Sequence, residues 1–424
     1  MVAPAAKSDP FLQRLLMISE RVYGPGGRNL KQDNRLCITR SDYLVGVDGP
    51  RQVEMNLIAC SLHHLSGKVV ELHKSNMQRL TLSSYGCCQD GCCPDTCKCL
   101  SPDNHQTTDG QQTLQRHLQA AHEMYRPAPG NLTGILAVGD LSGTNHIDQT
   151  SNLPADLSLY LSPSQLKETF LRGDLFLQED RLILKRHNCC CCTDHHHNFE
   201  VSVVYFRSGY AEDADTDTTW WDIRETIERS RAFKCPSVPQ QLTGSKSVQS
   251  LLAQDDILRA LGMVGEIAIV TQSDDAVHRI MAVTALQADP TLNSSIVEKA
   301  LAFPENFVLK PCKEGGGNNL FGEDIPPMLV EILKNSSEGS DWVLMERVEA
   351  SAETTVLVEI RAGQPLYYGQ PVQNEIGMYG CVLVHEGTCV QNVSEGYLCR
   401  MKPPTSNEGG MCAGSGFLGS LVTY

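Results

Sequence analysis

The chain has 424 residues, of which 41% are hydrophobic, so it is long enough for two or three domains around a substantial core. Its 35 lysines and arginines against 50 acidic residues give a formal net charge of −15, which argues against nucleic acid as a main partner, because phosphate backbones require a basic face. Since no apolar run approaches ~18 residues and the first residues lack the apolar stretch of a signal peptide, we expect a cytoplasmic protein without a membrane span, secreted only if a longer precursor exists.

The N-terminal part predicts a helix and then a polar strand. Residues Phe11 to Tyr23 have the apolar spacing of a helix, and glycines follow directly. A turn at Asp48-Gly49-Pro50 precedes a strand over residues 52–56, whose alternation places Glu54 and Asn56 on one face. Two oxygen-bearing side chains placed in this way could hold a cation, although a solvent-facing strand edge explains the pattern equally well.

Two cysteine-rich insertions interrupt the next region. The first, residues 86–99, lies between helices predicted over 69–82 and 112–125. The second, residues 187–198, lies at the tip of a hairpin between strands predicted over 182–185 and 201–206 and also contains three consecutive histidines. Adjacent cysteines with nearby histidines could bind Zn, but a low-complexity loop is the favoured interpretation. In a secreted protein a disulfide network would be the alternative.

The remaining elements suggest an α/β organisation. Residues 132–138 predict a strand that opens a compact α/β unit reaching to about Gln241. Helical periodicity continues over residues 222–232 and 247–261, and strands with glycine turns dominate from Phe307 to the end. We find no internal repeat.

The most informative segment follows an apolar strand that ends near Lys310. Glu314, three glycines and two asparagines come next. Consecutive glycines let backbone N–H groups approach phosphate oxygens, the lysine supplies positive charge, and the carboxylate can hold a divalent cation. The order of residues differs from that of a Walker A loop. The segment therefore predicts a nucleoside triphosphate site of another kind, and a plain glycine turn between strands is the weaker interpretation.

This segment resembles the glycine-rich loop of the eukaryotic-type glutathione synthetase family of ATP-grasp ligases. Other motifs resemble those of the family in the same order, from about residue 40 to residue 414. They are Arg40-Ser41-Asp42-Tyr43, Val53-Glu54-Met55-Asn56, residues 203–210, residues 228–246, Leu344-Met345-Glu346-Arg347, Glu375-Ile376-Gly377, and Arg400-Met401-Lys402 before Gly409-Gly410. Agreement of so many motifs in the same order does not arise by chance.

The resemblance implies an α/β (α+β) architecture, an ATP-grasp fold with an inserted α/β substrate-binding domain and a glycine-rich lid. It implies three parts. Residues 1–130 would form the N-terminal part of the ATP-grasp body, residues 131–242 the substrate-binding domain, and residues 243–424 the nucleotide-binding and lid region. The family also implies a homodimer. The family carries a long portion before the Arg-Ser-Asp-Tyr motif, which this chain reaches by residue 40.

The resemblance further implies a reaction and a cofactor. ATP would activate the carboxylate of γ-glutamylcysteine as an acyl phosphate, and the amine of glycine would then attack it. Mg²⁺ would be held by Glu54, Asn56 and Glu314. Catalysis of this kind depends mainly on positioning and charge neutralisation. We therefore expect glutathione formation with ATP as co-substrate.

Three sets of site residues follow from the resemblance. The catalytic set is Arg40, Lys310 and Arg400. The ATP-binding set is Lys246, Lys310, Gly315, Gly316, Gly317, Asn319, Phe321, Met345, Glu346, Val348, Glu375 and Lys402. The substrate-binding set is Arg40, Ser61, Asn145, Gln149, Arg207, Tyr210, Arg400, Met411 and Cys412. Without the resemblance, an isolated arginine is more often a surface residue, and Met345 and Val348 would be read as strand core.

The sequence departs from the family pattern mainly in the substrate pocket. Gly143 stands where the family has an acidic residue, and Ala59 and Cys60 replace a serine and a small residue. Phe321 stands where a tyrosine is usual, and Met411 and Cys412 replace smaller or apolar residues. Three alternatives therefore stay open: glutathione synthesis, the same ligase chemistry with another acceptor such as alanine or serine, and a weakly active or non-catalytic descendant, including a secreted one.

Overall fold

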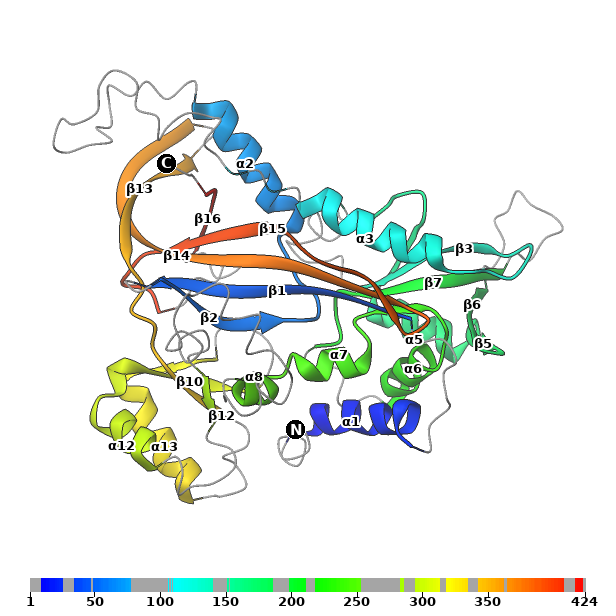
Figure 1. Ribbon diagram of the computed structural model, residues 1–424, viewed down its shortest axis with the longest axis horizontal. Helices are drawn as coiled ribbons and strands as arrows, with labels where there is room; N and C mark the ends of the chain where they lie inside the picture. The colour runs from blue at the N-terminus through cyan, green and yellow to red at the C-terminus, as the bar shows by residue number, and fades with distance from the viewer. Residues whose placement is uncertain are drawn as a thin grey trace.

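The computed structural model describes residues 9–25, 34–46, 49–77, 106, 108, 110–139, 151, 153–185, 198–210, 218–252, 283–285, 294–312, 318–334, 342–361, 364–407 and 416–421. These residues form a large mixed sheet, a smaller antiparallel sheet and the helices that cover them (Figure 1). The predicted α/β class is thereby confirmed.

The large sheet has twelve strands within the described part of the chain. Its main order is β16-β15-β14-β1-β8-β7-β3-β4, with β2 on β1, β13 on β14, and the β5–β6 hairpin on β7. The strands are β1 (Arg35–Gly46), β2 (Gly49–Asn56), β3 (Leu132–Val138), β4 (Ser158–Leu161), β5 (Leu175–Gln178), β6 (Arg181–Lys185), β7 (Asn198–Phe206), β8 (Phe233–Cys235), β13 (Ala352–Arg361), β14 (Gln364–His385), β15 (Thr388–Lys402) and β16 (Phe417–Gly419).

The pairing changes character across this sheet. β1, β8, β7, β3 and β4 pair in parallel, whereas β14 joins β1 and β15 by antiparallel ladders. β7 is buried at nearly every position, as expected for a central parallel strand rich in valine and aromatic residues. The β14–β15 hairpin turns at Glu386 and Gly387, whose φ angles of 49° and 77° suit a two-residue turn that matches the twist of the strands.

Helices cover both faces of the large sheet (Figure 1). On one face, α3 (Gly110–Met124) packs Leu114 and Leu118 in one core with Val203 and Tyr205 of β7, and α2 (His63–Met77) lies beside it. On the other face, α1 (Pro10–Tyr23), α5 (Pro163–Leu171), α6 (Thr218–Glu228) and α7 (Val238–Thr243) share a core with other residues of β7. Side chains alternate along a strand, so β7 supplies both cores.

The helix α1 has a complete N-terminal cap. Asp9 Oδ1 accepts hydrogen bonds from the backbone nitrogens of Phe11 and Leu12 at 2.8 and 3.1 Å, and Pro10 begins the helix. The helix predicted from Phe11 to Tyr23 is therefore confirmed.

The small sheet has the order β11-β10-β12-β9, formed by β9 (Val283–Ala285), β10 (Phe307–Pro311), β11 (Leu320–Phe321) and β12 (Trp342–Glu346). Leu309 and Leu344 pack against α12 (Ser294–Ala302) and α13 (Ile325–Lys334), while short 3₁₀ turns stand at Pro304–Asn306 and Gly322–Asp324. The opposite face carries Lys310, Val343 and Met345, next to α8 (Lys246–Leu252) and β2. This sheet thus presents one apolar face to its helices and one mixed face to the rest of the protein.

Most of the predicted elements are confirmed, with shifted ends. The strands over 132–138, 182–185 and 201–206 are present as β3, β6 and part of β7, and the strand over 52–56 lies within β2. The helix predicted over 222–232 was placed too late, because α6 ends at Glu228 and the chain then enters β8. α2 begins at His63, six residues before the predicted start at Val69.

Other expectations stay untested by the fold. The insertion at 86–99 and all but the last residue of the insertion at 187–198 lie outside the described residues, as does the end of the helix predicted over 247–261. The boundaries at 130/131 and 242/243 stay predictions, and the large sheet draws strands from all three segments. Among the described residues, no helix has the length and apolar character needed to span a membrane.

Candidate functional site

The ladders of β1 bring charged residues from four strands to one sheet face. Arg40 and Asp42 stand opposite Asn56 and Glu54 of β2. On its other side, β1 pairs with β14, and Glu375 of β14 stands opposite Arg400 of β15. Directly opposed residues point to the same face of a sheet, as do residues two apart on one strand. The side chains of all these residues therefore share one surface.

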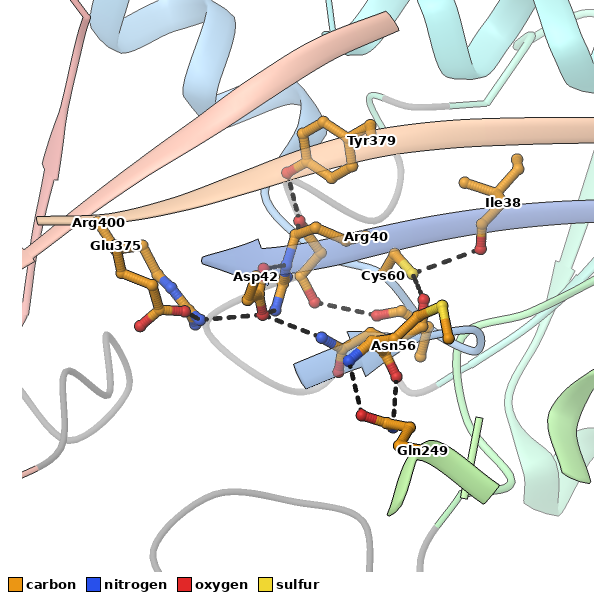
Figure 2. A network of polar contacts seen from close by, with 12 residues as sticks. Ile38, Arg40, Asp42, Asn56, Cys60, Gln249, Glu375, Tyr379 and Arg400 are labelled. Carbon is orange, nitrogen blue, oxygen red and sulfur yellow. Dashed lines mark hydrogen bonds and ion pairs between the residues drawn. The ribbon is translucent and has the colours of Figure 1, made fainter. Parts of the chain in front are cut away.

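Asp42 lies at the centre of this surface (Figure 2). Its side chain is 1% exposed and accepts hydrogen bonds from Arg40 Nε at 2.7 Å and Arg40 Nη2 at 2.8 Å. Its Oδ2 also accepts from Asn56 Nδ2 at 3.0 Å and from Arg400 Nη2 at 3.2 Å. Arg400 also forms an ion pair with Glu375. Although burial opposes it, the charge of Asp42 raises the pKa of Arg40 above its ordinary value, so this guanidinium stays charged.

Gly377 makes room for this pair of residues. It stands opposite Asp42 in the β1–β14 ladder, and a Cβ atom there would lie 2.8 Å from Asp42 Oδ1 and 2.9 Å from Arg40 Cδ. These distances are shorter than van der Waals contact, so any other residue would displace the ion pair. Packing against Asp42 and Arg40 therefore explains why the third residue of the Glu375-Ile376-Gly377 motif is a glycine.

Two arginines hold the loop that follows β2. Arg207, at the end of β7, donates to the carbonyl oxygen of Cys60 at 2.6 Å and to Ser61 Oγ at 3.3 Å. The carbonyl oxygen of Ser61 accepts from Tyr379 Oη at 2.8 Å and from Arg40 Nη1 at 3.5 Å. Ala59 has a φ angle of 52°, which a residue with a side chain adopts at some cost. These hydrogen bonds therefore fix the loop in a shape that its own backbone does not favour.

Burial controls the titration of two groups near this loop. His63 stacks on Tyr379 with ring centroids 3.7 Å apart, and burial with the nearby charges of Arg207 and Arg40 lowers its pKa well below the ordinary value. Cys60 Sγ lies 3.2 Å from the carbonyl oxygen of Asn56, and burial raises its pKa to about 11. The imidazole is therefore neutral and the thiol protonated near neutral pH, so Cys60 is not an activated nucleophile.

A pocket lies between the two sheets. It is partly open to solvent. Its lining residues come from β2, α8, β10 and β12: Val53, Glu54, Lys246, Gln249, Lys310, Val343 and Met345. The amide of Gln249 bonds both backbone groups of Met55, at 3.0 Å to the nitrogen and 2.9 Å to the oxygen, and so joins α8 to β2. Phe321 shares the face of the small sheet that carries Met345, because Val308 stands opposite both residues.

The pocket combines one carboxylate with two lysines. Lys246 Nζ lies 3.8 Å from Glu54 Oε1, and Lys310 Nζ donates to the carbonyl oxygen of Val53 at 3.3 Å. Burial would raise the pKa of Glu54, but the charges of Lys246 and Lys310 hold it below its ordinary value. Burial lowers the pKa of Lys310, an effect that Glu54 opposes and Lys246 strengthens. The pocket can therefore attract a polyanion while keeping an ionised carboxylate for a cation.

The structure brings many of the predicted site residues together. Those gathered around Asp42 or the loop after β2 are Arg40, Glu54, Asn56, Ser61, Arg207, Glu375 and Arg400, and those on or beside the pocket are Lys246, Lys310, Phe321 and Met345.

The remaining predicted residues either are not among those that line the pocket or surround Asp42, or lie outside the described residues. Tyr210 is 37% exposed at the end of its segment, Glu346 is exposed at the end of β12, and Lys402 Nζ donates to the carbonyl oxygen of Asn407 at 2.7 Å. Val348 follows β12 and Asn319 precedes β11. The positions outside the described residues are Gly143, Asn145, Gln149, Glu314, Gly315, Gly316, Gly317, Met411 and Cys412.

The sequence interpretation missed Asp42, Gly377 and Gln249 as parts of the site. A signal for Asp42 was present, because alternation along a strand through Arg40-Ser41-Asp42 would have put the carboxylate on the face of Arg40. Gln249 gives no such signal, since its function depends on where α8 meets β2.

The donor set fits a hard divalent cation. Glu54 offers carboxylate oxygens, and Asn56 uses its Nδ2 toward Asp42, which leaves its Oδ1 to face away from that carboxylate. Oxygen ligands of this kind suit Mg²⁺. Among the described residues, no group of three or more His, Cys, Asp and Glu side chains is placed to hold a metal ion. The predicted third ligand, Glu314, and the cysteine-rich segments that could bind Zn lie outside the described residues.

Comparisons with known proteins identify the family of the chain. Residues 1–423 match the family model described as eukaryotic glutathione synthase, ATP binding domain. The chain is 30% identical to the chloroplastic glutathione synthetase of Arabidopsis thaliana, over 98% of this chain and 69% of that protein, and 30% identical to the glutathione synthetase of Mus musculus, over 96% and 78%.

A solved structure shares the fold. It is that of a glutathione synthetase like-effector from Globodera pallida in its apo form, which matches with a TM-score of 0.60 and 16% identity over 94% of this chain and 80% of that one. The predicted ATP-grasp fold agrees with these matches. The chain belongs to the eukaryotic glutathione synthase family, whose members' names indicate a glutathione synthase-type ligase.

Proposed function

We propose that this protein joins γ-glutamylcysteine to glycine at the expense of ATP, giving glutathione, ADP and phosphate. The observation that supports this proposal most strongly is the adjacency of two sites. A lysine-lined pocket between two sheets suits a triphosphate, and it shares Glu54 and the strand β2 with a surface that carries Arg40 and Arg400. A ligase of this class needs its nucleotide and its carboxylate substrates side by side.

ATP would bind between the small and large sheets. Lys310 and Lys246 would contact the phosphates, and Met345 with Phe321 would border the base and sugar on the same face of the small sheet. The segment 314–317, with Glu346, Val348, Asn319, Glu375 and Lys402, would complete the nucleotide site. Fixed positive charge in a partly buried pocket stabilises charge that develops on a transferring phosphoryl group.

Mg²⁺ would be held by Glu54 and Asn56, with Glu314 as the third ligand. When bound, the cation would neutralise the triphosphate. The protein's own contribution is to keep Glu54 ionised through Lys246 and Lys310 and to orient the Asn56 amide through Asp42.

The carboxylates of the substrates would bind to the arginines. Arg207 and Ser61 lie together at the loop after β2 and would contact γ-glutamylcysteine, with Tyr210, Asn145 and Gln149 completing that site. Arg40 and Arg400 would bind near the acceptor, beside Met411 and Cys412. A guanidinium matches a carboxylate with two parallel hydrogen bonds, which fixes the direction of the substrate as well as its position.

The chemistry would proceed in two displacements. A carboxylate oxygen of γ-glutamylcysteine attacks the γ-phosphorus atom of ATP, ADP leaves, and an acyl phosphate forms. The amine of glycine then attacks the acyl carbon, loses a proton, and phosphate leaves with one oxygen from the original carboxylate. The residues described here position and neutralise the reactants and form no covalent bond with them.

A second candidate is the same ligase chemistry with another acceptor amine, such as alanine or serine. Ala59 and Cys60, which depart from the family pattern, lie in the loop that Arg40 and Arg207 hold. A change in this loop would alter the substrate pocket and leave the nucleotide pocket intact. We also propose that the protein forms a homodimer and is located in the cytoplasm.

An assay of ADP release tests this function. The protein would be incubated with ATP, Mg²⁺, γ-glutamylcysteine and a panel of amino acids, with products identified by mass. Glycine-dependent release with glutathione as product is the expected result. Release with a different amino acid alone would support the second candidate, and no release from a folded protein that binds ATP would overturn both.

A further inference from the structure

Asp42 receives more charged hydrogen bonds than an ordinary buried ion pair. Both of its oxygens are used by Arg40, and Oδ2 also accepts from Asn56 and Arg400 (Figure 2). These donors come from three strands, and Arg400 is 358 positions away in the chain. A single carboxylate therefore contacts residues from both the cation site and the acceptor site.

The bond to Asn56 decides which end of that amide faces the cation. An amide has one oxygen that can ligate a metal ion and one nitrogen that cannot. Because Asp42 can only accept, it draws the Nδ2 group to itself across 3.0 Å and turns Oδ1 away. Groups that orient a ligand in this way commonly change metal affinity about 10- to 100-fold when they are removed.

The bonds to the two arginines decide where the acceptor carboxylate can bind. Asp42 holds Arg40 through Nε and Nη2, which leaves Nη1 directed toward the loop at Ser61. It holds Arg400 through Nη2, on the side shared with Glu375. An arginine fixed on one edge presents its other donors in a constant direction.

On the basis of the ligase function proposed above, we propose that Asp42 is a positioning residue that couples the cation site to the acceptor site. It contacts neither substrate nor metal. Through its two oxygens it sets the amide of Asn56 and the guanidinium groups of Arg40 and Arg400 at the same time. Disturbing this one carboxylate should therefore weaken two kinds of ligand that bind different residues.

Asp42→Asn is the direct test. The variant keeps the shape of the side chain, but one of its two oxygens becomes an NH₂ group. In either orientation of the amide, this NH₂ group faces a hydrogen-bond donor, either Arg40 Nε or the donors that now bind Oδ2, so at least one hydrogen bond is lost. Mn²⁺ affinity is measured by electron paramagnetic resonance with a non-hydrolysable ATP analogue, and the KM for the acceptor is measured by turnover. We expect both constants to worsen by about tenfold or more, whereas binding of the analogue without divalent cation changes less than threefold.

Asp174→Asn is the matched control. Asp174 is also buried and pairs with Arg172 at 3.1 Å, but it lies immediately before β5, away from the site. The Asp174→Asn variant reports the effect of losing a buried carboxylate elsewhere. Its Mn²⁺ affinity, its KM for the acceptor and its affinity for the analogue without divalent cation should match those of the wild type. The same pattern in Asp174→Asn as in Asp42→Asn would overturn the proposal.

Gly377→Ala provides a second approach in case Asp42→Asn does not fold. The added Cβ would lie 2.8 Å from Asp42 Oδ1 and 2.9 Å from Arg40 Cδ, so it should move the Asp42–Arg40 pair without changing the charge of either residue. Gly380→Ala, on the same strand, is its control, because its Cβ meets Thr39 Oγ1 instead. Gly377→Ala should weaken Mn²⁺ and the acceptor together.

Three results would overturn the coupling: both constants within threefold of the wild type in a folded variant, a change in only one of them, or an equal loss of nucleotide binding. The Mn²⁺ measurement needs no turnover. A wild type that forms no glutathione would therefore refute the proposed function without deciding the role of Asp42, which that binding measurement and calorimetry with glycine would still test.

Discussion

Lys310 Nζ donates a hydrogen bond to the carbonyl oxygen of Val53 across 3.3 Å and so joins the small sheet to the large one. The two residues are 257 positions apart in the chain. Both line the pocket, where the lysine also faces the carboxylate of Glu54. Lys310 therefore helps to hold the two sheets together and supplies charge to the nucleotide site.

Lys310→Met should abolish most of the activity. The variant keeps the length of the side chain but removes the charge that would face the phosphates, so kcat should fall by about 100-fold or more. Steady-state kinetics with saturating substrates measure this loss. Lys299→Met, on α12, is the control, and equal losses in both variants would contradict the role of Lys310.

Glu54→Gln should weaken cation binding. The amide keeps one oxygen but lacks the negative charge of the carboxylate, which Lys246 and Lys310 keep ionised. Mn²⁺ affinity should therefore fall by about 100-fold, and more Mg²⁺ should be needed for activity. Titration with Mn²⁺ followed by paramagnetic resonance gives the affinity. Glu71→Gln, at an exposed ion pair on α2, should leave it unchanged. An unchanged Mn²⁺ affinity in Glu54→Gln would exclude this carboxylate as a ligand.

The acid stability of the protein should depend on His63. Its pKa in the folded state lies well below 6.5, so the unfolded chain binds a proton that the folded protein does not as pH falls below 6.5. Stability is therefore lost as pH falls, by about 1 kcal/mol between pH 6.5 and 5.5 for one such group.

His63→Phe should remove this part of the acid sensitivity, because phenylalanine can keep the stacking on Tyr379. Urea unfolding at pH 7.0 and 5.5 would give the difference in free energy for each variant. His64→Phe, at the next position of α2, controls for the loss of a histidine. Equal pH dependence in the wild type and His63→Phe would contradict the assignment.

Arg207→Lys should impair the donor substrate selectively. Lysine cannot bond the carbonyl oxygen of Cys60 and Ser61 Oγ in the same fork, so the loop should lose its shape and the KM for γ-glutamylcysteine should rise by about tenfold or more. The KM for ATP should change little. Arg229→Lys, at the Glu225 pair on the surface of α6, is the matched control. A parallel rise in the KM for ATP would point to general damage.

The sequence predicted best those features that depend on neighbouring residues. The apolar spacing of residues 11–23 and the dense valines of residues 201–206 identified a helix and a central strand, because local periodicity decides both. The resemblance added the residues of the site. Alternation placed Glu54 and Asn56 on one strand face, as the ladder with β1 confirms.

Features that depend on distant pairing could not be predicted in this way. β1 stands between β14 and β8, and only that ladder shows that Gly377 must lack a side chain beside Asp42. The convergence of Arg40 and Arg400 on one carboxylate likewise depends on residues 358 positions apart. α6 ends at Glu228, which is fully buried and accepts a hydrogen bond from Tyr23 Oη at 2.6 Å, a contact between distant residues that local periodicity does not reveal.

The transfer of oxygen from substrate to phosphate tests the central claim most directly. γ-Glutamylcysteine labelled with ¹⁸O in the cysteinyl carboxylate would be incubated with the protein, ATP, Mg²⁺ and glycine, and both products would be analysed by mass spectrometry. An acyl-phosphate ligase must place one ¹⁸O atom in each phosphate released and retain the other in glutathione. Phosphate without ¹⁸O, or release that does not depend on glycine and yields no glutathione, would contradict the account.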